Sequence, residues 1–147
     1  MPFTIEFWMY LTSVAGERIL YDTRGGHTDT GILTMLNGGV IKNLTAGAVQ
    51  TTGGTTIAAD TWYNATFVRS ASNHHQWYVN GTTQTSANTG NGTVASGTSY
   101  STSFLGDWAG GSFVFNGNIG PVQIYNRDLS ANEVLHNYNA LRGRFGL

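Results

Sequence analysis

Hydrophobic and polar residues alternate along the first segment of the chain. Between residues 3 and 11 every second position is apolar, and this period of two is typical of a strand with one face in a core. The apolar members are Phe3, Ile5, Phe7, Met9 and Leu11. The opposite face carries Trp8 and Tyr10, so we predict that a loop, a helix or a partner covers that face too.

The same pattern predicts a series of short strands that are separated by turn residues. They span residues 18–23, 32–37, 40–44, 62–69, 76–80, 104–106, 113–115 and 119–125. Gly38-Gly39 and Asn80-Gly81 are typical of tight hairpin turns, and Gly53-Gly54 predicts another turn. Roughly eleven to thirteen strands with frequent turns favour an antiparallel β-sandwich. Residues 86–103 are predicted to be a functional loop or to contain a short strand at 92–95.

The stretch from Gly117 to Ser130 predicts a core strand, a turn and the start of a helix. Val122 and Ile124 share one face of this strand and are the predicted core pair. Ser130 and Glu133 match the Ser-x-x-Glu capping box. The helix then carries apolar residues at helical spacing and is predicted to stop near residue 143, where a glycine stands.

These segments together resemble a known family. The pattern G-x-I-x-x-V-x-I-Y-N-R-x-L-S-x-x-E, which begins at Gly117, is similar to the closing segment of laminin-G-like, concanavalin-A-like jelly-roll domains. Residues 3–10 resemble the opening strand of the family, 62–69 and 77–81 its central hairpin, and 104–106 a later strand. The resemblance implies an all-β fold, an antiparallel two-sheet β-sandwich with one short C-terminal helix, in a single domain over residues 1–147.

Composition and charge exclude several classes of function. Charged residues make up 10% of the 147 positions, the net charge is -1, and no basic stripe is present, so we expect no nucleic-acid partner. The chain has no cysteine, which excludes disulfides and thiolate metal sites. No apolar run approaches the length of a membrane span. Because a strand is predicted to begin at Phe3, we expect no signal peptide.

Enzymatic activity is not expected from the distribution of acidic residues. Glycoside hydrolases of the resembled superfamily need two carboxylates that face each other across the scissile bond. No two of the eight carboxylates lie within four positions of each other, and the chain lacks a G-x-S-x-G motif. Glu133 is better explained as part of the helix cap. His74 and His75 are predicted to be solvated loop residues, because zinc sites need several converging ligands.

Glycan binding is a frequent role in the family that the chain resembles, and the resemblance therefore implies it here. Trp108 follows a strand and precedes two glycines, so it is the leading candidate for stacking on a sugar, with Asp107 and Asn91 as its polar neighbours. Packing of Trp108 as a lid on the core is an equal alternative. Several relatives bind Ca²⁺ through carboxylates and carbonyls, and the weak candidates here are Asp22, Asp29 and Asp107. Gly120 stands where many relatives have an aspartate, which disfavours a function tied to that carboxylate.

The prediction is therefore a non-catalytic structural and binding module without an obligatory cofactor. The C-terminal segment from residue 137 resembles the ending of such domains in bacteriophage structural proteins. This resemblance implies a virion component, a capsid decoration or tail-associated protein, whose partners are virion proteins, host glycans or a second copy of itself. The alternatives are a free-standing lectin-like protein, extracellular or on a cell surface, and a divergent glycoside hydrolase.

Overall fold

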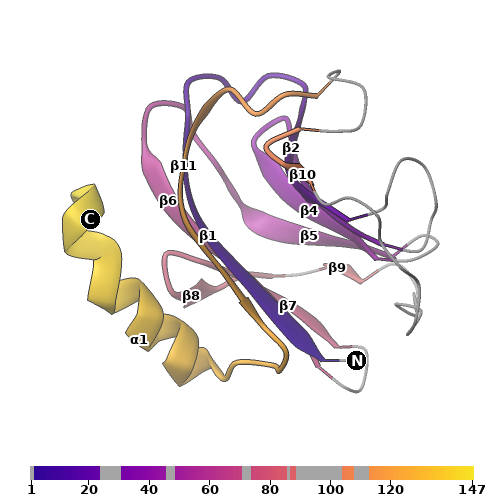
Figure 1. Cartoon of the computed structure of the whole chain (residues 1–147), viewed down its shortest axis with the longest axis vertical. Helices are drawn as coiled ribbons and strands as arrows, with labels where there is room; N and C mark the ends of the chain where they lie inside the picture. Colours follow the sequence, from indigo (N-terminus) through magenta and orange to yellow (C-terminus); the bar gives the residue numbers. More distant parts are fainter. Residues whose placement is uncertain are drawn as a thin grey trace.

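The computed structural model of the chain is a sandwich of two antiparallel sheets (Figure 1). It describes residues 2–23, 31–45, 49–70, 74–85, 87–88, 104–107 and 113–147. One sheet contains β1 (Phe3–Leu11), β6 (Trp62–Arg69), β7 (His75–Val79), β8 (Thr82–Thr83) and β11 (Gly117–Tyr125). The other contains β2 (Glu17–Asp22), β3 (Ile32–Asn37), β4 (Val40–Thr45), β5 (Val49–Thr56), β9 (Ala87–Asn88) and β10 (Phe104–Leu105). After β11 follow α1 (Ala131–Leu141) and the 3₁₀ helix η1 (Arg142–Phe145).

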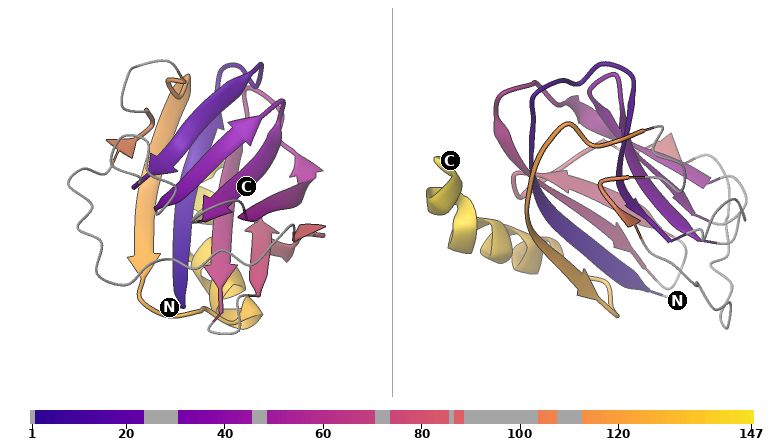
Figure 2. Two further views of the ribbon diagram at one scale, coloured as in Figure 1. Left: turned by 90° about the vertical axis from the view of Figure 1, so that its right-hand side faces the viewer. Right: turned by 45° about the horizontal axis from the view of Figure 1, so that its top comes forward.

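The strand order is β11-β1-β6-β7-β8 in the first sheet and β10-β2-β3-β4-β5-β9 in the second. The two views in Figure 2 show these sheets as two layers, with α1 on the outer side of the first. The predicted antiparallel two-sheet β-sandwich with one short C-terminal helix is thus confirmed.

The core lies between the two sheets and follows the alternation of β1. The apolar residues of β1 from Phe3 to Leu11 are buried there, as predicted. Trp77 of β7 lies at the centre, with its ring centroid 6.5 Å from that of Phe7 and 5.1 Å from that of Phe67. The aromatic contacts add to the free energy of burying this apolar area.

Hairpins at two of the predicted turns are confirmed, and the third prediction is wrong. β3 pairs with β4 across Gly38-Gly39, and β7 pairs with β8 across Asn80-Gly81. Gly53-Gly54 instead lies inside β5, where the pairing with β4 skips from Thr52 to Thr56. The two glycines therefore form a bulge in a continuous strand.

Two smaller predictions, the strand at 113–115 and the solvated His75, are wrong. Residues 113–115 form no strand, although the carbonyl of Phe113 accepts a hydrogen bond from the Ile19 amide at 2.9 Å. His75 begins β7 and is buried beside Phe67, so it is not a solvated loop residue, whereas His74 is exposed. α1 ends at Leu141, close to the predicted stop near residue 143, and the 3₁₀ helix η1 continues to Phe145, before Gly146 with its φ of 76°. The predicted strand at 92–95 lies outside the described residues.

The predicted core pair of β11 separates into one packed and one exposed residue. Val122 packs against the core, but 59% of Ile124 is exposed to solvent. β11 is the edge strand of its sheet, and the facing sheet ends there in β10, which has two residues. Ile124 therefore shares the inner face with Val122 but has little of the second sheet above it.

The outer face of the five-stranded sheet is covered by the C-terminal segment. Trp8 is stacked between Tyr138 of α1 and Phe145 of η1, with ring centroids 5.8 and 4.2 Å away. Phe145 also contacts Trp62, at 4.6 Å between centroids. Trp8 is 1% exposed, so the predicted cover of this face is the chain's own helix. Trp8 is consequently not available as a contact surface for a neighbouring protein.

Gly120 is the residue of β11 that makes room for this cover. A Cβ atom at this position would lie 2.9 Å from the Cβ of Trp8 and 3.2 Å from the Cζ of Phe145. Both contacts are closer than carbon atoms tolerate without a shift. The absence of a side chain at Gly120 therefore lets the tail lie flat on Trp8.

Candidate functional site

The residues predicted as a glycan site fall largely outside the described part of the chain. Trp108, Asn91 and Asp29 are not among the described residues. Asp107 is described and follows Gly106, whose amide donates to the carbonyl of Leu20 at 3.1 Å. Asp107 thus lies beside β2, near the beginning of β11.

Two of the three calcium candidates, Asp22 and Asp107, lie in the described part of the chain. Asp22 is buried on β2 and pairs with Phe104, three residues before Asp107. Among the described residues no group of three histidine or acidic side chains could hold a metal ion.

A polar groove lies at the other end of β11, between the loop that follows it and the first turns of α1. It encloses about 320 Å³, at the lower end of the range for ligand pockets. Its lining combines a phenol, a guanidinium, an imidazole, a carboxylate and two amides. The residues are Tyr125, Arg127, Leu129, Asn132, Glu133, His136 and Asn137.

The helix cap fixes one wall of this groove. The Ser130 side chain accepts from the Glu133 amide at 3.3 Å, and the Glu133 carboxylate accepts from the Ser130 amide at 2.8 Å. The predicted capping box is confirmed. Because Glu133 and Asn137 are four residues apart, the same helical face presents both side chains to the groove.

Arg127 and Glu133 form an ion pair across the rim of the groove. The Nη2 of Arg127 lies 2.8 Å from the Oε1 of Glu133. This bond, together with those from Ser130, lowers the pKa of Glu133 from 4.5 to about 2, and it also raises the pKa of Arg127. The pair keeps the carboxylate ionised, and the guanidinium carries further N–H donors besides the one that Glu133 accepts.

A buried hydrogen-bond network beneath the groove holds Asn137 in place. The carboxylate of Glu6, which is 1% exposed, accepts one bond from the Asn64 amide and one from the Asn137 amide, each of 3.0 Å. Asn137 also donates to the Tyr125 hydroxyl at 3.0 Å, and that hydroxyl donates to Gln123 at 2.6 Å. Both N–H bonds of the Asn137 side chain are therefore used, and its carbonyl oxygen is the group left for a ligand.

The loop between β11 and α1 is attached to β1 by one threonine. Thr4 is buried, and its hydroxyl donates to the Arg127 carbonyl at 2.9 Å and accepts from the Leu129 amide at 3.0 Å. These two hydrogen bonds fix the position of the backbone from which Arg127 projects. The groove is therefore built on ordered elements and not on a free loop.

Apart from Glu133 in its capping box, the residues of this groove are not among those predicted from the sequence. Asn132 and His136, like Glu133 and Asn137, are four residues apart, so the helix that the sequence predicts already places two rows of polar side chains together. A polar helical face that directly follows a strand is the signal that could have found the site. Its contact with β1 is long-range in sequence and leaves no local pattern.

The groove has the groups for hydrogen bonding but not those for acid–base hydrolysis. A glycosidase needs two carboxylates about 5 to 9 Å apart that are free to donate and attack. Glu133 is held by Arg127 and the helix cap, and Glu6 is buried and accepts from two amides. Among the residues that line the groove, no second carboxylate faces Glu133.

Comparison with known proteins places this fold among lectin-like sandwiches. The similar solved structures include the CBM40 of the Ruminococcus gnavus IT-sialidase bound to α2,3-sialyllactose, with a TM-score of 0.76, 14% identity, and coverage of 93% of this chain and 82% of that chain. A proposed carbohydrate-binding protein from Bacteroides ovatus gives a TM-score of 0.71 at 14% identity. A botulinum neurotoxin type C structure, described by its interaction with two ganglioside molecules, gives 0.66 at 14%.

The chain covers only part of the last two proteins. It aligns over 91% of its own length with 40% of the Bacteroides chain, and over 95% with 36% of the neurotoxin chain. No curated protein matches the sequence. A family model for the concanavalin A-like lectin/glucanases superfamily matches residues 1–135, which is most of the sequence. The chain therefore belongs to the concanavalin A-like lectin/glucanase superfamily.

Proposed function

We propose that this chain is a non-catalytic glycan-binding module and that the polar groove between β11 and α1 is its binding site. The observation that carries the proposal is the convergence of a guanidinium, two amides, an imidazole and a phenol on one hollow. The description of similar structures by their sialyllactose and ganglioside ligands supports the same class of ligand.

The groove matches the chemistry of a sugar ring. Sugar hydroxyls both donate and accept, so a site must offer both kinds of group at fixed positions. Arg127 supplies donors, the Asn137 carbonyl accepts, and the exposed side chains of Asn132 and His136 can do either. The half-buried ring of Tyr125 gives an apolar wall on which the C–H face of a sugar can lie.

The groove and Asp107, the described member of the predicted Trp108 site, lie at different ends of β11. A Cβ atom at Gly106 would touch Ile119, and Tyr125 follows Ile119 by six residues, about 20 Å along a strand. Glycan binding at Trp108, Asp107 and Asn91, with or without Ca²⁺, is therefore a separate prediction, which variants can distinguish from binding in the groove.

A glycan array with matched variants tests the proposal. We expect the wild-type chain to bind at least one glycan class, the double variant Asn132→Ala/His136→Ala to lose this binding, and Trp108→Ala to retain it. Asn132 and His136 are exposed, so their removal leaves the fold intact. Loss of binding in the Trp108 variant alone would move the site to the predicted loop, and an array without any bound glycan would refute the function.

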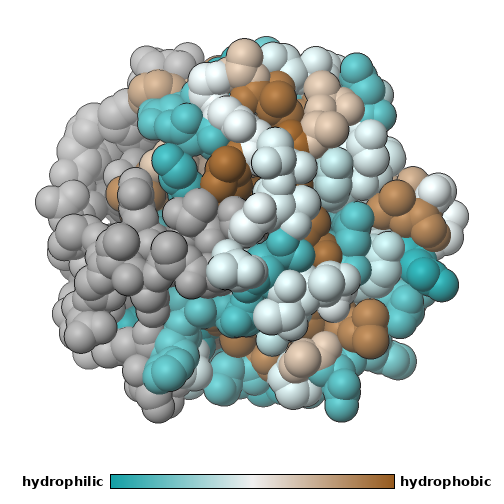
Figure 3. Space-filling view, turned by 180° about the vertical axis from the view of Figure 1, so that it is seen from behind, coloured by the Kyte–Doolittle hydropathy of each residue, from teal (hydrophilic) through white to brown (hydrophobic). Residues whose placement is uncertain are grey.

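The setting of the module on a bacteriophage particle is a further part of this proposal. It is supported by the resemblance of the C-terminal segment to phage structural proteins. The helices among the described residues are too short and polar to cross a membrane. On the face shown in Figure 3, the coloured hydrophobic residues form separate small patches. Mass spectrometry of purified particles tests this setting: stoichiometric presence is expected, and recovery only as free protein would favour a free-standing lectin.

A further inference from the structure

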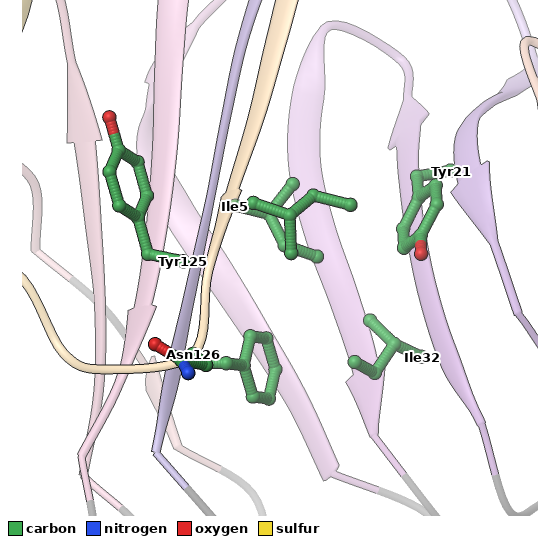
Figure 4. A pocket seen from close by; sticks show the side chains of 7 residues that line it. Ile5, Tyr21, Ile32, Tyr125 and Asn126 are labelled. Carbon is green, nitrogen blue, oxygen red and sulfur yellow. The ribbon is translucent and has the colours of Figure 1, made fainter.

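A second hollow, the edge cleft, opens between the two sheets beside β11. Its walls are Phe3, Ile5 and Ile124 of one sheet and Tyr21 and Ile32 of the other, with Tyr125 and Asn126 at the rim. It encloses about 530 Å³. Figure 4 shows Ile5, Tyr21 and Ile32 facing the space between the sheets, whereas the ring of Tyr125 points away from it.

The cleft exposes apolar surface that the described residues leave uncovered. Phe3 and Ile5 at its floor are buried core residues, but Ile124 at its mouth is 59% exposed. Ile124 is exposed because β11 is the edge strand of its sheet. At the facing edge of the other sheet, β10 is two residues long, so it extends over little of β11. Concave apolar surface in contact with water marks ligand sites, because filling it releases that water.

The lining restricts the chemistry of a ligand. None of the described residues that line the cleft carries a charge, so an ion that entered would lose its hydration without a counter-charge from them. The hydroxyl of Tyr21 and the amide of Asn126 are the polar side-chain groups that border it. The geometry points to a binding site for a neutral, mainly apolar small molecule with one hydrogen-bonding group, independent of the glycan groove.

The shape of the cleft favours a small molecule over a protein segment. Its two walls belong to different sheets, which pack about 10 Å apart, so the free space is about one side-chain layer thick. A helix with its side chains is about 10–12 Å wide and does not enter such a slot. The enclosed volume lies within the range of small-molecule pockets.

Binding of N-phenyl-1-naphthylamine, a neutral fluorophore that is dark in water, tests the inference on the full chain. We expect saturable binding that 1-decanol displaces. Ile124→Trp fills the mouth of the cleft and should weaken binding about tenfold or more. Leu135→Trp is the matched control, because Leu135 is also exposed (43%) but lies on α1 outside the cleft; it should leave the affinity unchanged.

A second variant guards against a simple failure to fold. Ile124→Ser removes the contact without adding bulk, and it should also weaken binding while the urea midpoint stays near that of the wild type. Equal affinity in all variants, or no saturable binding by the wild type, would overturn the inference. So would a dimer that Ile124→Ser converts to monomer, since a second copy would then cover the cleft.

Discussion

Phe145 lies almost parallel to Trp8, with 4.2 Å between the ring centroids and 16° between the ring planes. The stack joins the last helical turn of the chain to the middle of β1. It closes the outer face of the five-stranded sheet. The same face carries α1, which forms one wall of the polar groove. The C-terminal turn is therefore part of the fold that supports the proposed site.

Phe145→Ala should destabilise the chain by about 2 kcal/mol, which is less than for a fully buried phenylalanine because the ring is only half-buried. Urea unfolding measures this change, and the fluorescence of Trp8 should shift to the red. Leu147→Ala is the control, since Leu147 is 38% exposed and lies two residues further on. Equal, small effects of both variants would show that the tail does not close this face.

Gly81→Ala should cost more stability than Gly38→Ala. Both residues have positive φ, 71° and 57°, so both variants pay the backbone cost of about 1 kcal/mol. A Cβ at Gly81 would also lie 3.0 Å from Leu135 and Tyr138 of α1, whereas Gly38 has open space. The difference between the two unfolding free energies therefore measures the packing of α1 on the β7–β8 turn. If the two variants lose the same stability, α1 does not pack tightly there.

Glu6→Gln should destabilise the chain by roughly 1–3 kcal/mol. A carboxylate accepts hydrogen bonds at both oxygens, whereas a glutamine amide accepts at its oxygen and donates at its nitrogen. Each Glu6 oxygen accepts from a different amide, so one N–H group of Asn64 or Asn137 would face another N–H. Glu17→Gln is the control, since Glu17 accepts one bond from Asn37 and a glutamine oxygen can replace it. Thermal unfolding of both variants provides the comparison, and equal losses would contradict the buried network.

Stability should fall as the pH decreases from about 4.5 towards 2. The pKa of Glu133 is about 2 in the folded chain and 4.5 in the absence of its partners. The unfolded chain thus binds more protons in this window, and the stabilisation present above pH 4.5 is lost as the pH falls through the folded pKa. Glu133→Gln should flatten this part of the profile, measured by urea unfolding at several pH values. An unchanged slope would show that the carboxylate is not held by Arg127 and Ser130.

The sequence predicts those features that short-range chemistry determines. The Ser130–Glu133 capping box and the Asn80-Gly81 turn are both local, and both are confirmed. The sequence predicts a turn at Gly53-Gly54, but the pairing of the flanking Thr52 and Thr56 with β4 keeps the two glycines within a strand. The alternation along β11 predicts Ile124 as a core residue, and Ile124 does lie on the inner face of the strand. Its exposure depends on how far the second sheet extends. Local patterns do not contain that information.

In the candidate site, too, the local spacing of residues can be read from the sequence, whereas the long-range contacts cannot. The polar spacing of Asn132 and His136 is present in the sequence, but the contact of Asn137 with Glu6 joins residues 131 positions apart. Without the knowledge that α1 lies over β1, the helix face has no partner and its polar residues are indistinguishable from a solvated surface. The predicted residues Trp108, Asn91 and Asp29 lie outside the described residues and stay predictions.

The central claim, glycan binding in the polar groove, is tested most directly by an NMR titration of the chain with an oligosaccharide identified on the array. We expect the largest chemical-shift changes at the side-chain amides of Asn132 and Asn137 and at the His136 ring, with little change at Asp107. Shifts that instead concentrate at Asp107 and Trp108, with the groove signals unmoved, would contradict the account.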